Sequence, residues 1–224
     1  MSSEKIPFIP YSVPSYTEEE MKERAKSFYS FMDSRRSVRE FSDKDVPREV
    51  IENIIKTAGT APSGAHKQPW TFCVIRNAEL KHKIRELAEE EERINYAGRM
   101  SDRWIKDLEP FGTDWVKEFI DIAPWIIIVL KRSYDFDEKS EKTQNYYVNE
   151  SVGIAAGMLI AAIHNAGLVT LTHTPSPMNF IAKALERPDN EKPFLLLPVG
   201  YPAENCKVPD LKRKDFKDIA LFFE

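Results

Sequence analysis

Residues 125–130 read Trp-Ile-Ile-Ile-Val-Leu, an uninterrupted apolar run that predicts a strand buried on both faces of a sheet. Residues 71–75 (Thr-Phe-Cys-Val-Ile) have the same character, and two later segments, 169–172 and 194–199, also predict strands. The chain therefore contains at least four candidate strands, widely separated along the sequence.

Helical signals surround these strands. Thr17 begins a capping-box sequence, Pro47 is suited to the first turn of a second helix, and Asn77 is a candidate cap for a third. The longest predicted helix covers residues 145–166, and Gly167 is placed to end it. Connections of this length between strands predict an α+β fold in which helices cover a sheet.

The remaining segments predict the domain organisation. Residues 1–16 are rich in proline and predict an N-terminal arm, followed by a single domain at 17–224. Residues 93–121 predict partial helix with a break near Pro110, and 133–143 predicts a charged surface loop. A short helix is expected to begin at Ser176-Pro177.

Composition excludes several classes of protein. The chain has 224 residues, with 32 Lys and Arg against 36 Asp and Glu, a net charge of −4. This is typical of a globular protein and argues against nonspecific binding to nucleic acid. No apolar run is long enough to cross a membrane, and no signal peptide is visible, so we expect a cytoplasmic protein. The two cysteines, Cys73 and Cys206, fit neither a metal site nor a disulfide framework.

A short basic segment, Arg35-Arg36-Ser37-Val38-Arg39, is the first candidate for binding chemistry. Such a run is usually a solvated face, but three guanidinium groups beside a hydroxyl also suit the oxygens of one phosphate group. No Rossmann, Walker A or metalloprotease motif is present, and no metal site is predicted.

Two further segments carry polar groups at positions suited to a ligand. Pro62-Ser63-Gly64-Ala65 is a turn in which glycine permits close approach of the backbone to a ligand. Residues 170–174 place three hydroxyls and the His173 imidazole at the end of a strand. The hydroxyls can satisfy local backbone groups or bond a ring nitrogen of a planar cofactor, and His173 alone favours a capping or surface role.

These segments together resemble the FMN-dependent nitroreductase superfamily. The motifs that carry the resemblance are RRSVR at 35–39, PSGAHKQPW at 62–70, LPVGYP at 197–202 and LKRK at 211–214. Within the superfamily, the chain is most similar to the branch whose members remove halide reductively from iodotyrosines. That similarity rests on ERINYAGRM at 92–100, TDWVKE at 113–118, residues 165–175 and VPDLKRK at 208–214, and it covers roughly residues 20–215.

The resemblance implies a nitroreductase-like fold, a central mixed sheet covered by helices, in an intertwined homodimer with FMN at the subunit interface. It implies that the Thr174 hydroxyl lies near flavin N5 and is the catalytic group. The cofactor-binding residues that it implies are Arg35, Arg36, Ser37, Val38, Arg39, Pro62, Ser63, Gly64, Thr172, His173, Thr174 and Arg213.

The resemblance also implies a halotyrosine substrate. A free amino acid is a zwitterion, so Glu92 would bind its ammonium and Lys117 its carboxylate. Tyr96, four residues after Glu92 and on the same helix face, would cover the aromatic ring, and the Ala65 amide would lie near the phenolate. Considered alone, Glu92 belongs to an acidic run and Lys117 is an ordinary surface lysine. Residues 92–117 would form a lid that excludes water.

The implied reaction is FMN-dependent removal of halide from mono- and diiodotyrosine and other halotyrosines, with reduced flavin supplying electrons in single-electron steps. The alternative is a general nitroreductase or quinone reductase that uses NAD(P)H and hydride transfer. A flavin-binding or ligand-binding protein without turnover, and a scaffold without flavin, are further alternatives. The electron donor is either NAD(P)H or a separate reductase.

The chain departs from the superfamily pattern at particular positions. Thr172-His173-Thr174 replaces a run of three threonines, and Arg93 stands where another acidic residue is expected. Animal members of this branch carry an N-terminal membrane anchor, which this sequence does not show.

Overall fold

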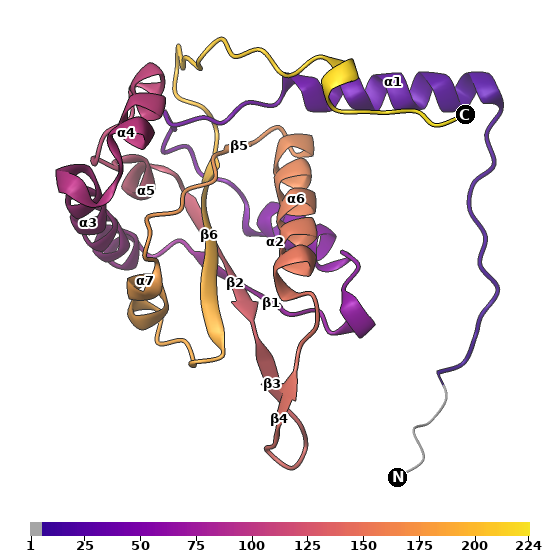
Figure 1. Cartoon of the computed structure of the whole chain (residues 1–224), viewed down its shortest axis with the longest axis horizontal. Helices are drawn as coiled ribbons and strands as arrows, with labels where there is room; N and C mark the ends of the chain where they lie inside the picture. The colour runs from indigo at the N-terminus through magenta and orange to yellow at the C-terminus, as the bar shows by residue number, and fades with distance from the viewer. Residues whose placement is uncertain (1–5) are drawn as a thin grey trace. The chain divides into compact units, whose positions relative to one another are not determined.

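The computed structural model describes residues 6–224 of a chain that divides into two compact units, residues 1–35 and 36–224 (Figure 1). The first five residues of the predicted arm lie outside the described residues. In the N-terminal unit, helix α1 (Glu18–Ser34) follows an extended segment. The predicted capping box is confirmed, because Thr17 Oγ1 accepts from Glu20 N at 3.3 Å and Thr17 N donates to the Glu20 carboxylate at 2.8 Å.

The second unit contains the sheet. Its helices are α2 (Arg48–Gly59), α3 (Ala78–Ile94), α4 (Asp102–Leu108), α5 (Phe119–Ile122), α6 (Val148–Asn165) and α7 (Asn179–Ala184). Its strands are β1 (Trp70–Ile75), β2 (Trp125–Arg132), β3 (Tyr134–Phe136), β4 (Lys142–Gln144), β5 (Val169–Thr170) and β6 (Glu191–Gly200). Short 3₁₀ turns lie at Gly64–His66, Glu109–Phe111 and Phe216–Asp218, and a π-helical turn, Asn95–Arg99, continues α3.

The main sheet has four strands in the order β1-β2-β6-β5, and each of these neighbouring pairs is antiparallel. The predicted α+β fold and its four strands are confirmed, although β5 is shorter than the predicted segment 169–172. Among residues 6–224, the parallel component of the expected mixed sheet is one bridge, between Ser37 and Thr170.

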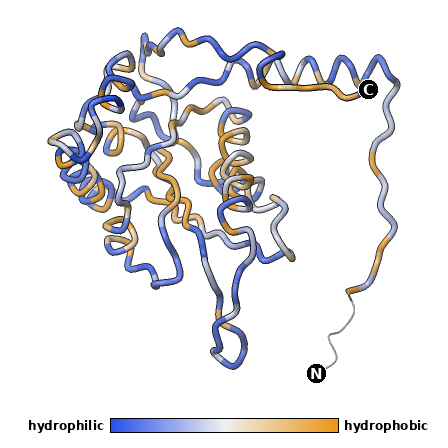
Figure 2. The backbone as a smooth tube through the Cα atoms, in the orientation of Figure 1, coloured by the Kyte–Doolittle hydropathy of each residue, from blue (hydrophilic) through white to orange (hydrophobic). Residues whose placement is uncertain are grey.

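Strand β2 forms the centre of the core, because its side chains alternate between two helical layers. Ile127 and Val129 pack with α2 and α6 on one face, whereas Ile126, Ile128 and Leu130 pack with α3, α5 and α7 on the other. All five side chains are fully buried. Figure 2 shows the corresponding hydrophobic path through the middle of this unit.

Residues 133–143, predicted to be a charged surface loop, lie at the surface but are not simply a loop, because they contribute to the β3–β4 hairpin. The Asn145 side chain fixes the base of the hairpin, donating to the Arg132 carbonyl at 3.0 Å and to Asp135 Oδ2 at 2.9 Å. Asn145 is therefore outside the helix that was predicted to begin there. Tyr147 adopts a left-handed conformation (φ 48°), and α6 begins at Val148.

Several predicted helix boundaries are confirmed within a few residues. Asn77 Oδ1 accepts from Leu80 N at 2.8 Å and caps α3, as expected. Gly167 follows α6 with φ 74°, a conformation that glycine adopts at low cost. The break expected near Pro110 lies between α4 and α5, and the short helix expected at Ser176-Pro177 begins at Asn179.

Candidate functional site

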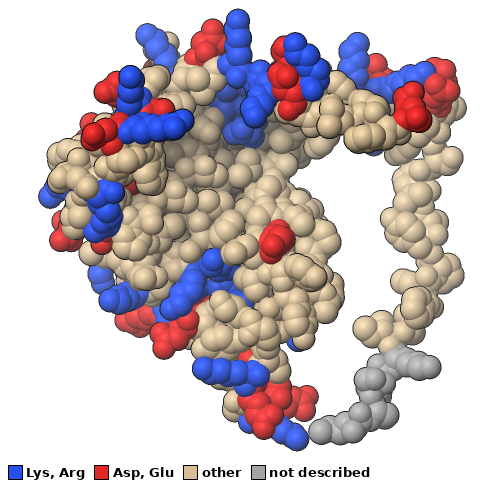
Figure 3. Space-filling model, viewed as in Figure 1, with Lys and Arg blue, Asp and Glu red and all other residues tan. Residues whose placement is uncertain are grey.

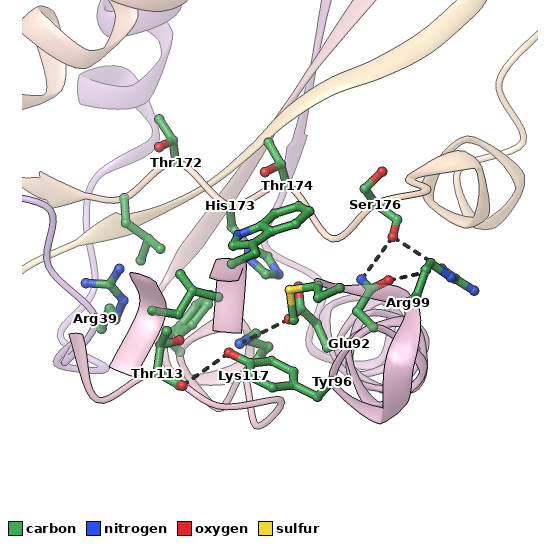
Figure 4. A pocket seen from close by; sticks show the side chains of 16 residues that line it. Arg39, Glu92, Tyr96, Arg99, Thr113, Lys117, Thr172, His173, Thr174 and Ser176 are labelled. Atoms are coloured by element: carbon green, nitrogen blue, oxygen red, sulfur yellow. Dashed lines mark hydrogen bonds and ion pairs between the residues drawn. The ribbon is translucent and has the colours of Figure 1, made fainter. Parts of the chain in front are cut away.

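A cavity of about 290 Å³ lies between α3, α4, α5 and the segment that follows β5. The predicted site residues that line it together are Arg39, Glu92, Tyr96, Lys117, Thr172, His173 and Thr174. Figure 4 shows that these side chains come from both sides of the cavity. Residues far apart in the sequence therefore meet where polar and aromatic groups can contact one ligand.

Glu92 and Lys117 form an ion pair inside this cavity. Glu92 Oε2 lies 3.7 Å from Lys117 Nζ, and the two side chains are 13% and 5% exposed. Lys117 Nζ also donates to the carbonyl of Asp114. Burial raises the pKa of Glu92 despite Lys117, and burial lowers the pKa of Lys117 despite Glu92. The pair is therefore incompletely stabilised, and further polar partners would favour its charged form.

Tyr96 connects the two ends of the segment that was predicted to be a lid. Its hydroxyl donates to the Thr113 carbonyl at 3.1 Å, across the cavity from the end of α3 (Figure 4). Burial raises the pKa of Tyr96, and the neighbouring Glu92 carboxylate adds to this effect. Tyr96 therefore stays a neutral hydrogen-bond donor, with its ring on the cavity wall.

The segment after β5 directs alternate side chains to opposite sides. Thr172 and Thr174 are exposed, whereas Leu171 and His173 are buried. Figure 4 shows the two threonines on one side and the His173 imidazole on the other, towards Lys117. The backbone of His173 is fixed by paired hydrogen bonds with Leu196, of 2.9 and 3.0 Å. Thr172, His173 and Thr174 all line the cavity. The two threonine side chains lie on its exposed side, and the His173 ring lies on the buried side.

His173 is held as a neutral imidazole. Its ring packs edge-on against Phe119, with centroids 5.5 Å apart, and its Nε2 has no hydrogen-bond partner within residues 6–224. Burial, followed by the charges of Lys117 and Arg39, lowers its pKa to about 3. The capping or surface role considered from sequence does not describe this side chain, because it is 8% exposed and faces the cavity.

The basic segment joins the site through its backbone. Val38 N donates to the Thr170 carbonyl at 3.2 Å, which places residues 36–39 beside the start of the threonine segment. Arg39 lines the cavity, and its guanidinium carbon lies 5.9 Å from the centre of the Phe111 ring. Val38 is buried and Ser37 is exposed. Two other arginines of the predicted phosphate group, Arg36 and Arg213, do not line the cavity.

The predicted loop Pro62–Ala65 does not line the cavity either. It packs against the start of α6, where Gly64 N donates to Ser151 Oγ at 3.4 Å. A Cβ at Gly64 would lie 3.0 Å from the Tyr147 ring and 3.1 Å from the Tyr146 carbonyl oxygen, so a larger residue here would require these neighbours to move slightly. Ala65, His66 and Gln68 have φ values of 49°, 55° and 47°. Such left-handed backbone at three non-glycine residues is the kind of strain that functional loops retain.

Asn95 and Arg99, which connect the end of α3 to the threonine segment, were not predicted as site residues. Asn95 Nδ2 donates to the Ser176 carbonyl at 3.0 Å, and Arg99 reaches the same carbonyl at 3.4 Å. Both residues line the cavity with Glu92. Helical periodicity could have identified them, because positions three and seven residues after Glu92 lie on the same face.

The described residues form neither a metal site nor a helix that could cross a membrane. Within residues 6–224, no group of three or more His, Cys, Asp or Glu side chains is arranged to hold a metal ion. The helices of the described chain are all too short or too polar to cross a membrane.

The fold and the cavity define a class of protein. The chain belongs to the nitroreductase family, whose sequence model matches residues 32–201. Within that family it is similar to iodotyrosine deiodinase. It is 60% identical to the protein of that name from Haliscomenobacter hydrossis over 212 residues, which are 95% of this chain and 96% of that one. It is 52% identical to the Danio rerio protein of that name, over 97% of this chain and 74% of the relative.

A solved structure gives a similar result. The crystal structure of oxidized iodotyrosine deiodinase bound to FMN and 3-iodo-L-tyrosine superposes with a TM-score of 0.76 at 28% identity. The alignment covers 87% of this chain and all of the other. The family and the branch implied by the sequence motifs are therefore confirmed.

Proposed function

We propose that the chain is an FMN-dependent enzyme that removes iodide reductively from mono- and diiodotyrosine and acts on other halotyrosines. The observation that carries this proposal is the buried Glu92–Lys117 pair, which faces the threonine segment across one cavity. The 60% identity to an iodotyrosine deiodinase over nearly the whole chain supports the same activity.

The residues present fit FMN. Exposed hydroxyls of Thr172 and Thr174 can bond the polar edge of a flat ring, and the adjacent segment supplies Arg36, Ser37 and Arg39. Guanidinium groups suit the oxygens of a phosphate tail, and hydroxyl groups can bond the polar edge of a planar ring. Bound FMN supplies the electrons of the reaction. Arg35, Val38 and Arg213 complete the phosphate end in this proposal.

The substrate's amino-acid group is assigned to the ion pair. Glu92 accepts from the ammonium, and Lys117 donates to the carboxylate. Burial favours the neutral form of both groups although they pair with each other, so the ammonium and carboxylate of a zwitterion would give each a second opposite charge. Dehalogenation replaces a carbon–iodine bond by carbon–hydrogen and consumes two electrons and one proton. The pair contributes orientation to this reaction, holding the ring beside the Thr174 hydroxyl, which we assign as the catalytic donor.

Residues 92–117 serve as a lid over the substrate. Tyr96 bonds Thr113 across this segment, and the Arg93 guanidinium lies 4.5 Å from the centre of the Trp115 ring. Arg93 therefore stacks on an aromatic ring of the lid, at the position where an acidic residue was expected from the family pattern. A closed lid excludes water and strengthens the charged contacts below it.

The active form is a homodimer in this proposal. The exposed side of α6 carries Gly153, Ile154 and Gly157, and Figure 3 shows few charged side chains over this helix. Large apolar side chains are also exposed near the C-terminus, including Phe222 and Phe223. A self-complementary interface would bury these surfaces and bring the Pro62–Ala65 loop of one subunit to the cavity of the other. Ser63, Gly64 and the Ala65 amide then complete the flavin and substrate sites.

The electron donor is either NAD(P)H or a separate reductase, and we propose a cytoplasmic location. Both cysteines are free, which suits a reducing compartment. The general nitroreductase or quinone reductase alternative gives no role to the buried Glu92–Lys117 pair, because those substrates carry no ammonium or carboxylate.

The proposal is tested by steady-state iodide release. The purified flavoprotein, supplied with dithionite, should release iodide from 3-iodo-L-tyrosine with a much lower KM than from 2-iodophenol, which lacks the zwitterion. Equal KM values for the two compounds would contradict the assigned role of the ion pair. If neither compound releases iodide but the protein still reduces a nitroarene, the nitroreductase alternative would be favoured.

A further inference from the structure

Charged side chains on one face of α3 hold the segment that carries Lys117. Lys81 is 6% exposed, and its Nζ donates to the carbonyls of Asp121 and Ala123, each at 2.7 Å. One turn further along α3, Arg85 donates to Asp121 Oδ2 at 2.9 Å. These contacts fix α5 against α3 at the end that is distant from the substrate cavity.

Glu89 makes the next contact on this face, closest to the cavity. It is 8% exposed, and its Oε1 accepts from Arg85 Nε at 2.7 Å and from the backbone N–H of Lys117 at 2.8 Å. Glu92 lies three residues later on the same helix. One helix face therefore holds the main chain of Lys117 through Glu89 and faces its side chain through Glu92.

We propose that Glu89 is a positioning residue, which fixes the backbone of Lys117 so that the ammonium group reaches the substrate carboxylate. The inference rests on the proposed function, because it requires Lys117 to bind that carboxylate. Glu89 does not line the cavity. It was not among the predicted site residues, and it lies outside the motifs at 92–100 and 113–118 that predicted the substrate residues.

The contact geometry explains why glutamate is suited to this position. One oxygen receives two donors from different elements, so the carboxylate must extend far enough from α3 to meet both. Burial alone would raise the pKa of Glu89, but the Lys117 N–H and Arg85 outweigh it and hold that pKa below its ordinary value. The carboxylate therefore remains ionised and keeps both bonds.

The structure distinguishes two substitutions of Glu89. Aspartate keeps the charge but shortens the side chain by one methylene group, so the carboxylate cannot reach the Lys117 N–H without movement of the backbone. Glutamine keeps both the length and an oxygen acceptor for that N–H. If position matters more than charge, Glu89→Asp should be the more damaging change, which is the reverse of the order expected from charge alone.

The test measures binding to the oxidised FMN-loaded protein by quenching of flavin fluorescence. Two ligands are compared: 3-iodo-L-tyrosine, and 3-iodotyramine, which has the ammonium but no carboxylate. We expect Glu89→Asp to raise the Kd of 3-iodo-L-tyrosine about fivefold or more, the scale of one weakened hydrogen bond to a charged ligand, and to change the Kd of 3-iodotyramine less than about twofold. Glu89→Gln should change both values less than Glu89→Asp does.

Glu90→Gln is the matched control, because Glu90 is the next residue of α3 and is exposed. FMN content and melting temperature show whether each variant is folded. If Glu89→Asp is unstable, the Kd values of Glu89→Gln for the two ligands provide a second test. Wild-type affinity for 3-iodo-L-tyrosine in Glu89→Asp, or an equal loss for both ligands, would overturn the positioning role. Failure of the wild type and Glu90→Gln to bind 3-iodo-L-tyrosine would instead contradict the proposed function.

Discussion

Glu92 Oε2 and Lys117 Nζ lie 3.7 Å apart, on α3 and on the segment before α5, and both side chains are almost fully removed from water. Burial raises the pKa of Glu92 and lowers the pKa of Lys117, which favours the neutral form of each group. A ligand that carries both an ammonium and a carboxylate would therefore stabilise the charged pair. This relationship is the basis of the substrate assignment.

Glu92→Gln tests that assignment, because it removes the negative charge and keeps the shape of the side chain. We expect the KM for 3-iodo-L-tyrosine to rise about tenfold or more, since one partner of a buried charge pair is lost. Glu90→Gln, on the exposed side of α3, serves as the control. A rise in KM only for nitroarenes would show that the pair does not bind the zwitterion.

Thr174→Ala tests the catalytic role of the exposed hydroxyl. Thr174 is on the open side of its segment, so its loss should lower kcat for dehalogenation and leave FMN bound. We expect a fall of about tenfold or more, the scale of one donor that acts in the transition state. Stopped-flow oxidation of the reduced protein by 3-iodo-L-tyrosine measures the effect, and unchanged kinetics would refute the role.

The buried His173 imidazole should make the free energy of unfolding depend on pH. Its pKa is about 3 when folded against an ordinary value of 6.5, so the unfolded chain binds the proton first as the pH falls. The free energy of unfolding should therefore decrease between about pH 6.5 and pH 3, by about 2 kcal/mol at pH 5.

Urea unfolding of wild type and His173→Thr at pH 7.5 and pH 5 measures this effect. The variant should lose less stability than the wild type on acidification. His66→Gln, which changes an exposed histidine, is the control and should behave as the wild type. Equal losses in wild type and His173→Thr would show that this imidazole is not responsible.

Gly200→Ala should create a packing defect at the end of β6. A Cβ at Gly200 would lie 2.6 Å from Pro124 Cδ, and this proline directly precedes β2. We expect a loss of about 1–3 kcal/mol in the free energy of unfolding, typical of overpacking. At Gly59, the last residue of α2, a Cβ would meet no atom within 4 Å, so Gly59→Ala is the control and should not lower stability.

Ile154→Glu tests the proposed homodimer. Ile154 is 46% exposed on the side of α6 that carries few charged side chains, and a symmetric interface would place the new charge near its own copy. Sedimentation equilibrium should give the mass of two chains for the wild type and of one chain for the variant, which should also retain less FMN. A variant that remains dimeric with full flavin content would place the interface elsewhere.

Local rules predicted most of the fold. The buried run at β2, the caps Thr17 and Asn77, and Gly167 after α6 each depend on neighbouring residues. The β3–β4 hairpin was not predicted, because its short, charged strands depend on hydrogen bonds from the Asn145 side chain. Such a contact is visible only after the chain has folded.

The site was only partly predictable for the same reason. Motifs identified Glu92, Lys117 and Thr174, and the structure brings them to one cavity. The separation of His173 from its neighbouring threonines follows from the alternation of an extended segment, but which side is buried depends on Phe119 and Leu196. The place of the Pro62–Ala65 loop at the start of α6 depends on tertiary packing that the sequence does not display.

The most direct test of the account is a single turnover without oxygen. The FMN-loaded protein is reduced with dithionite, freed of excess reductant, and mixed with 3-iodo-L-tyrosine while the flavin spectrum and iodide are recorded. We expect full return of the oxidised flavin spectrum, with one iodide and one tyrosine formed per flavin. If the flavin stays reduced with 3-iodo-L-tyrosine but is oxidised promptly by a nitroarene, the chain is not a halotyrosine dehalogenase.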